Sequence, residues 1–271
     1  MTQREGKADG DCNEGDTRPF VAPCRQLAPA EPLQWLRAGW KDYRTAAGLS
    51  LAWGLFCFFL SAIVTWAAWV AGGWILLLSV LSGFIFVGPL LAFALYSVSR
   101  QLCLGRRPSL FQTLRAARKP FANALVFALV LLVIFLLWAR AGSMVHIFFP
   151  SEGTIRMEGL VIYLAVGSAV GSLFAAICFA ASVFSLPFIA NRDVDVVTAV
   201  VSSINAVLRN PGTMSIWALC VVSLTAVGFA TAMLGFILII PLLGYATWHA
   251  YRATLEVTDW PTLPLTKMEE S

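Results

Sequence analysis

The chain has 271 residues, of which 59% are hydrophobic and only 13% are charged, with a formal net charge of +4 at pH 7. A soluble domain carries about 45–50% apolar and about 25% charged residues, so this composition excludes a soluble fold with a charged surface. The basic residues form no continuous stripe, which excludes a basic surface for nucleic acid. The long apolar runs indicate insertion into a membrane more than once.

Residues 1–30 are rich in Gly, Asp, Glu, Arg and Pro and contain no sustained apolar run. They lack the apolar stretch and small-residue cleavage site of a signal peptide. We expect a disordered cytoplasmic tail here, a single transmembrane domain over 31–255, and a second cytoplasmic tail over 256–271. The first span would then also act as the insertion signal.

The apolar runs predict an all-α membrane protein with six transmembrane helices. The spans cover about 46–70, 74–98, 121–138, 160–189, 213–232 and 235–251. The last two come from one run, Thr213–Tyr251, which would reach roughly 58 Å as a single helix, about twice the hydrocarbon thickness. We therefore expect a tight turn near Leu234-Gly235. An arrangement of five spans and one protruding helix stays open.

The distribution of basic residues predicts the orientation. With six spans and the amino terminus inside, only Arg140 and Arg156 among the 19 Lys and Arg residues lie outside the cytoplasm. This is a strong positive-inside bias, and it places both termini in the cytoplasm. A five-span arrangement would move only Arg252 and Lys267 to the other side.

Three segments with the 3.6-residue period of an amphipathic helix precede the spans. They cover 32–48, 108–120 and 195–209, and their last turns carry Arg44, Arg118 and Arg209. We expect them to lie at the cytoplasmic interface as boundaries of repeats. In 32–48 the residues Leu33, Leu36, Trp40 and Tyr43 would form the apolar face, and in 195–209 the valines would be buried among acyl chains or neighbouring spans.

The spans also resemble one another. "PLLAFALYSVSR" (89–100) and "PLLGYATWHAYR" (241–252) share Pro, Leu, Leu, Ala and the closing Arg at matched positions. We predict three parallel repeats, each an interfacial helix followed by a transmembrane hairpin, over about 32–100, 107–190 and 194–252. The alternative is chance similarity among apolar segments. Parallel repeats differ from the inverted pairs of many secondary transporters.

The stretches "FVGPLLAFALYSVSR", "RPSLFQTLRAARKP" and "RDVDVVTAVVSSINAVLRNPG" resemble an uncharacterised family of bacterial integral membrane proteins, a domain of unknown function. The resemblance covers roughly residues 32 to 255. It implies a bacterial inner membrane and no established activity. Some members carry a label likening them to cytochrome c oxidase subunit I. The two histidines, His146 and His249, fall on opposite sides of the predicted bilayer and cannot share one haem iron, so we reject the oxidase interpretation.

No pattern in the sequence predicts catalysis, a cofactor or a metal centre. There is no phosphate loop, nucleophile elbow or HExxH, and the six cysteines show no metal-ligand spacing. We expect no enzymatic activity. Two alternatives stay open: an external metal site at His146, Glu152 and Glu158, and a proton switch at His249, which we otherwise interpret as an interfacial residue.

Four positions within the spans are candidates for helix packing or gating. Gly167 and Gly171 have GxxxG spacing, which allows close helix approach within the bundle or in a dimer. Pro89 and Pro241 would kink their helices and free carbonyl groups that could line a polar pathway. Asn123, near the start of a span, is expected to make a packing or capping hydrogen bond.

The favoured function is an accessory or scaffolding protein that contacts lipid and, through its helices, other membrane subunits or a second copy. The absence of Asp, Glu, Lys and Arg well inside the predicted spans argues against ion-coupled transport. The alternative is a passive channel or a transporter of apolar or zwitterionic small molecules. A lipid-directed enzyme ranks third.

Overall fold

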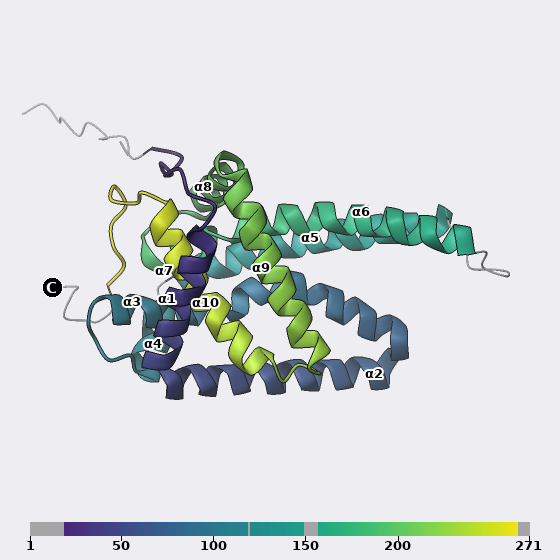
Figure 1. Cartoon of the computed structure of the whole chain (residues 1–271), viewed down its shortest axis with the longest axis horizontal. Coiled ribbons are helices and arrows are strands. Elements are labelled where there is room, and N and C mark those ends of the chain that lie inside the picture. The colour runs from purple at the N-terminus through teal and green to yellow at the C-terminus, as the bar shows by residue number, and fades with distance from the viewer. Residues whose placement is uncertain (1–18, 119, 149–156, 265–271) are drawn as a thin grey trace, which may run out of the picture.

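The computed structural model describes residues 19–118, 120–148 and 157–264, and all regular structure in them is helical. The helices are α1 (Glu31–Thr45), α2 (Ala47–Leu91), α3 (Phe93–Cys103), α4 (Leu110–Arg118), α5 (Phe121–Phe148), α6 (Met157–Ser182), α7 (Ser185–Asn191), α8 (Val196–Arg209), α9 (Pro211–Ala230) and α10 (Phe236–Thr254). Figure 1 shows α1, α3, α7 and α8 gathered at one end, which we call the base together with segments 19–30 and 255–264. The far ends of α2, α5 and α6 project away from the base.

Five of the six predicted spans fall on candidate membrane spans, although the second of these covers Phe86–Cys103 rather than 74–98. In the described residues, five stretches are long and apolar enough to cross a bilayer: Ala47–Gly73, Phe86–Cys103, Phe121–Met144, Val161–Asn191 and Pro211–Ala230. The sixth predicted span falls on α10, which is not among them. Its second half carries polar residues such as His249 and Arg252, which lower the hydropathy of the helix. The sixth span therefore stays a prediction.

The chain reverses direction at two predicted places. Inside α2, Gly73 has φ 57° and ψ −142°, a conformation that glycine adopts without the usual side-chain clash. Between α9 and α10, Ala232 and Met233 have positive φ. The Thr231 hydroxyl supports this second turn by accepting a hydrogen bond from the Gly235 amide at 2.9 Å. Both turns lie where the apolar runs are interrupted or too long for one span.

Helix α10 lies at the centre of the packing and contacts α1, α2, α3 and α9. Two of these contacts depend on glycine. A Cβ atom at Gly39 of α1 would lie 2.8 Å from the amide nitrogen of Ala246, and one at Gly54 of α2 would lie 2.0 Å from the carbonyl oxygen of Ile237. Because no side chain intervenes at these positions, α1 and α2 approach the α10 backbone directly.

The three short amphipathic helices form as predicted, and each ends just before a long apolar helix. Within the protein itself, α8 buries mainly small and hydroxyl residues. Its buried residues are Val196, Thr198, Ala199, Ser202, Ser203 and Ala206, whereas Val197 is 60% exposed and Leu208 is 72% exposed. Val200 and Val207 are partly buried against the core, and the exposed Val197 and Leu208 remain available to acyl chains or other helices, so the predicted burial of the valines stays a prediction.

The reason that small and hydroxyl residues are buried lies in the break between α6 and α7. There the Phe184 amide donates to Ser203 Oγ at 3.1 Å, and the Ser203 hydroxyl donates to the Ala180 carbonyl at 2.7 Å. In a continuous helix the Phe184 amide would donate to the Ala180 carbonyl. Here the Ser203 hydroxyl bridges these two groups instead. Small hydroxyl residues satisfy backbone groups that valine would leave unpaired, so they occupy the buried face.

The amino-terminal segment also differs from the expected disordered tail. Residues 1–18 lie outside the described part, but the Ala22 amide donates to Ser202 Oγ at 2.9 Å and the Leu27 amide donates to Asn210 Oδ1 at 2.9 Å. Asn210 Nδ2 donates in turn to the carbonyls of Arg25 and Ala206, both at 3.1 Å. Asn210, the first residue of the Asn-Pro-Gly sequence, therefore fastens segment 19–30 to the junction of α8 and α9.

The carboxy-terminal segment is held in a similar way. The Leu263 amide donates to the Asn191 carbonyl at 3.0 Å, and the Asp193 amide donates to the Pro261 carbonyl at 2.9 Å. Trp260 is buried and packs edge-on against Phe188, with ring centroids 5.3 Å apart. Up to residue 264, the segment predicted as a cytoplasmic tail is thus part of the base.

Replacing Asn210 with alanine should release the amino-terminal segment. The variant loses both Nδ2 hydrogen bonds and the acceptor for Leu27, which should lower the free energy of unfolding by about 1–3 kcal/mol. We expect trypsin to cleave after Arg25 several-fold faster than in the parent protein. Gln112→Ala, at an exposed position, is the control and should leave cleavage unchanged. Equal cleavage rates in both variants would contradict the role of Asn210.

Candidate functional site: a buried Asp–Ser–His cluster

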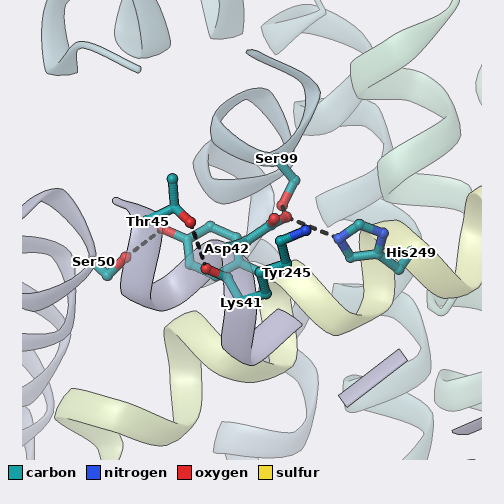
Figure 2. A network of polar contacts seen from close by, with 7 residues as sticks. All are labelled: Lys41, Asp42, Thr45, Ser50, Ser99, Tyr245 and His249. Atoms are coloured by element: carbon teal, nitrogen blue, oxygen red, sulfur yellow. Dashed lines mark hydrogen bonds and ion pairs between the residues drawn. The ribbon is translucent and has the colours of Figure 1, made fainter. Parts of the chain in front are cut away.

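Three side chains from three helices meet in the base. Asp42 of α1 is 9% exposed. Its Oδ2 accepts a hydrogen bond from Ser99 Oγ of α3 at 2.7 Å and lies 2.9 Å from His249 Nε2 of α10 (Figure 2). One carboxylate oxygen thus joins α1, α3 and α10.

The local sequence explains how Asp42 reaches this position. Trp35, Gly39 and Asp42 follow one another at helical spacing, and all three are buried. The close approach of Gly39 to Ala246 brings α1 onto α10. Asp42 and His249 lie one turn beyond these two residues on their helices, so their side chains can meet.

A second polar contact extends the cluster to the start of α2. The hydroxyl groups of Ser50 and Tyr245 lie 2.8 Å apart, and both residues are fully buried (Figure 2). Ser50 Oγ also contacts the Ala46 carbonyl at 2.9 Å. Tyr43 lies beside this contact, and burial raises the pKa of its phenol. The polar contacts therefore fasten α1, α2, α3 and α10 to one another.

The arrangement defines what the cluster can do chemically. Ser99 donates to Asp42, and His249 contacts the same carboxylate oxygen. A hydrolytic nucleophile instead needs its hydroxyl bonded to a histidine that acts as base, and here the carboxylate stands between the two groups. The contact between His249 and Asp42 joins α10 to α1, while Ser99 fixes the orientation of the carboxylate.

Asp42 and Ser99 were missed by the sequence analysis. Asp42 is a lone acid within an amphipathic helix, and its signal is its spacing from Trp35 and Gly39. Leu33 is 54% exposed and Trp40 is 42% exposed, so the bulky residues of the predicted interfacial face do not mark the side of α1 that packs inside the protein. Ser99 carried no signal beyond its place near the end of a span.

Of the residues considered in the sequence, His249 belongs to this cluster, whereas the seven candidates for packing, gating or repeat boundaries lie outside it. Arg44, Arg118 and Arg209 are exposed in the last turns of α1, α4 and α8, as expected of helix ends at an interface. Arg209 Nε donates to Asn205 Oδ1 at 3.3 Å. Their role as boundaries of repeats stays a prediction.

The two glycines on α6 face open space. A Cβ atom at Gly167 or Gly171 would meet no atom within 4 Å. They are therefore not sites of close packing within the described part of the chain. Contact with a helix outside the chain stays a prediction.

Each of the two prolines lies near a backbone carbonyl that the first half of α2 contacts. Helix α2 ends at Leu91, two residues after Pro89, and the Leu91 carbonyl accepts a hydrogen bond from Trp53 Nε1 at 3.0 Å. Pro241 is buried in α10 and lacks the amide that would bond to the Ile237 carbonyl, the group that Gly54 approaches. A gating role for either proline stays a prediction.

Asn123 behaves as expected, because its Nδ2 donates to the Val194 carbonyl at 3.0 Å and so links α5 to the segment before α8. Among the residues that the structure describes, no three His, Cys, Asp or Glu side chains are grouped to hold a metal ion. The alternative metal site lies outside this part: Glu152 is not described, nor are the side chains of His146 and Glu158.

These apolar helices, joined to one polar base, are those of a multi-pass integral membrane protein. Residues 75–191 match a family described as a predicted integral membrane protein, DUF2189. The match runs from the second half of α2 to the end of α7, a narrower range than residues 32 to 255. It includes Ser99 but neither Asp42 nor His249. No curated protein and no solved structure matches the chain.

Proposed function

We propose that this chain is an accessory or scaffolding component of the bacterial inner membrane. In this proposal it has six spans in three parallel repeats of interfacial helix and hairpin, with both termini in the cytoplasm, and it carries out no enzymatic reaction. The contrast between a packed base and sparsely packed spans is the observation that supports it. Only 17% of the residues in the most apolar parts of Ala47–Gly73 and Phe121–Met144 are buried, whereas Phe86–Cys103 and Val161–Asn191, which end in the base, are 50% and 56% buried.

The exposed faces of these spans need apolar surroundings, which lipid or other membrane helices can supply. The base, by contrast, is fastened by hydrogen bonds from both terminal segments. A rigid base that holds apolar hairpins apart suits a protein that gathers partners between them. The alternative, a passive channel or a transporter of apolar or zwitterionic molecules, requires polar groups along a route. Gly54 lies against the Ile237 carbonyl, which Pro241 leaves without its helical amide, and this covered carbonyl favours the accessory role.

Purification with a carboxy-terminal tag in mild detergent, followed by quantitative mass spectrometry, tests the proposal. We expect a partner protein in stoichiometric amount, absent from a control purification of an unrelated multi-pass protein. An absorption scan of the same sample checks the oxidase interpretation, which a haem band would restore. A chain that purifies alone and supports solute flux in liposomes would overturn the accessory role.

Cysteine labelling tests the orientation and the number of spans. Cys103 is exposed at the end of α3, whereas burial raises the pKa of the Cys24 thiol and makes it a weaker nucleophile. In a variant that keeps only Cys103, an impermeant maleimide should label inverted vesicles but not intact spheroplasts. A single cysteine from Ser151→Cys should show the opposite pattern. A single cysteine from Ser271→Cys tests the number of spans. If the chain has six spans, this cysteine should show the labelling pattern of Cys103. If the chain has five, it should show the pattern of the Ser151→Cys cysteine.

A further inference from the structure

A basic depression opens in the base beside the end of the Val161–Asn191 span. It has a volume of about 250 Å³, and its lining includes Arg25, Asn191, Arg192, Tyr251, Arg252 and Glu256. These residues come from the amino-terminal segment, the junction after α7, and the end of α10 with the segment that follows. Since the span ends at Asn191, the depression lies at the level where lipid headgroups meet water.

The charges in this depression do not balance. Arg25 Nε lies 3.0 Å from Glu256 Oε1, and both side chains are about half exposed. This pair neutralises itself. Arg192 and Arg252 add two positive charges, and the lining contains no second acid to offset them.

Arg192 is held in place with part of its guanidinium unused. Its Nη1 donates to the Trp260 carbonyl and to Thr262 Oγ1, both at 2.7 Å. Its buried Nε has no hydrogen-bond partner among the described residues. A buried N–H group without an acceptor is costly, so negative charge placed in the depression beside this guanidinium would be favourable.

The other polar groups suit an oxyanion. Asn191 Nδ2 donates to the Tyr251 hydroxyl at 3.0 Å, which places an amide and a phenol in the same wall. Arg252 is exposed on the last turn of α10, so its guanidinium can turn toward a ligand. Two guanidinium groups with neighbouring neutral polar groups are the set that proteins use for phosphate.

We propose that this depression binds a phosphate group, either the headgroup phosphate of an anionic lipid or a free phosphate ion. The site is independent of the accessory role, because the arginines and the lining carry it whatever the spans contact. Bound phosphate would join the amino-terminal segment, α7 and the end of α10, and so would stabilise the base.

The test uses the full chain in nanodiscs of phosphatidylcholine, either pure or with a minor fraction of phosphatidylglycerol. Native mass spectrometry measures how much phosphatidylglycerol is retained, and thermal unfolding measures stabilisation by that lipid or by added inorganic phosphate. We expect Arg252→Gln to weaken binding about tenfold, and Arg252→Glu to abolish it. Arg252 is exposed, so neither change should prevent folding. Arg209→Gln and Arg209→Glu, at another exposed helix end, are the matched controls and should change binding less than twofold.

The two sources of phosphate give different results. Retention of phosphatidylglycerol that depends on Arg252 identifies the lipid, while stabilisation by inorganic phosphate in pure phosphatidylcholine identifies the free ion. Equal losses in the Arg252 and Arg209 variants would mean general attraction of basic residues to an anionic surface, and would overturn the proposal. The absence of any retention or stabilisation would overturn it as well.

Discussion

We expect the Asp42→Ala variant to lose about 2–3 kcal/mol of its free energy of unfolding, because the buried Ser99 and the partly buried His249 lose their common partner. Ser99 and His249 both contact Asp42 Oδ2, at 2.7 Å and 2.9 Å. Removing the carboxylate leaves the Ser99 hydroxyl unpaired where water has no access and takes away the partner of a ring nitrogen that is only partly buried. Unfolding by increasing amounts of SDS in mixed micelles, followed by tryptophan fluorescence, measures the loss.

An exposed ion pair is the control for this experiment. Glu256→Ala breaks the contact with Arg25, whose side chain is 59% exposed, and should change stability by less than about 1 kcal/mol. The cluster also predicts non-additivity. Ser99→Ala should destabilise the parent protein by about 1 kcal/mol but add little in the Asp42→Ala background, because its acceptor is already gone. Additive losses would show that Ser99 and Asp42 act separately.

The apolar elements could be predicted from the sequence because their signals are local. A run of apolar residues fixes a span by length alone, and glycines at 72 and 73 mark where α2 reverses. The three short helices follow from the 3.6-residue period. Each of these features depends on residues that are neighbours in the chain, so no tertiary contact is needed to recognise it.

The buried faces of α1 and α8 could not be predicted by the same rules. In a soluble protein the bulky apolar residues of an amphipathic helix face the core. Here Trp40 of α1 and Val197 of α8 face outward, while Gly39 and Ser202 face the protein. Beside a membrane the surroundings are also apolar, so burial inside the protein favours small residues and those that hydrogen-bond.

The Asp42 cluster depends on that reversal. If the bulky residues Trp40 and Tyr43 formed the inner face of α1, the aspartate between them would point toward solvent. It becomes buried only when Trp35, Gly39 and Asp42 form that face. Its partners lie 57 and 207 residues away along the chain, and nothing in their local sequence links them to α1. Pairings of this kind emerge only from the three-dimensional packing around α10.

Glycine substitutions test that packing directly, and we expect their effects to rank by the space around each Cβ position. At Gly54 an added Cβ would lie 2.0 Å from the Ile237 carbonyl oxygen, and at Gly39 it would lie 2.8 Å from the Ala246 amide nitrogen. Both contacts are with backbone, which cannot move aside as a flexible side chain can. Gly54→Ala should therefore cost about 3 kcal/mol or more, and Gly39→Ala somewhat less.

Gly171→Ala is the matched control, because the same methyl group enters open space on a helix. Alanine is favoured over glycine inside a helix by up to about 1 kcal/mol, so this variant should be as stable as the parent or slightly more stable. The three variants can be compared by thermal unfolding in one detergent and by the yield of monodisperse protein on size exclusion. If Gly54→Ala proved as stable as Gly171→Ala, the direct approach of α2 to α10 would be refuted. A Gly171→Ala variant that lost a dimer while keeping its thermal stability would instead place the partner helix on the outer face of α6.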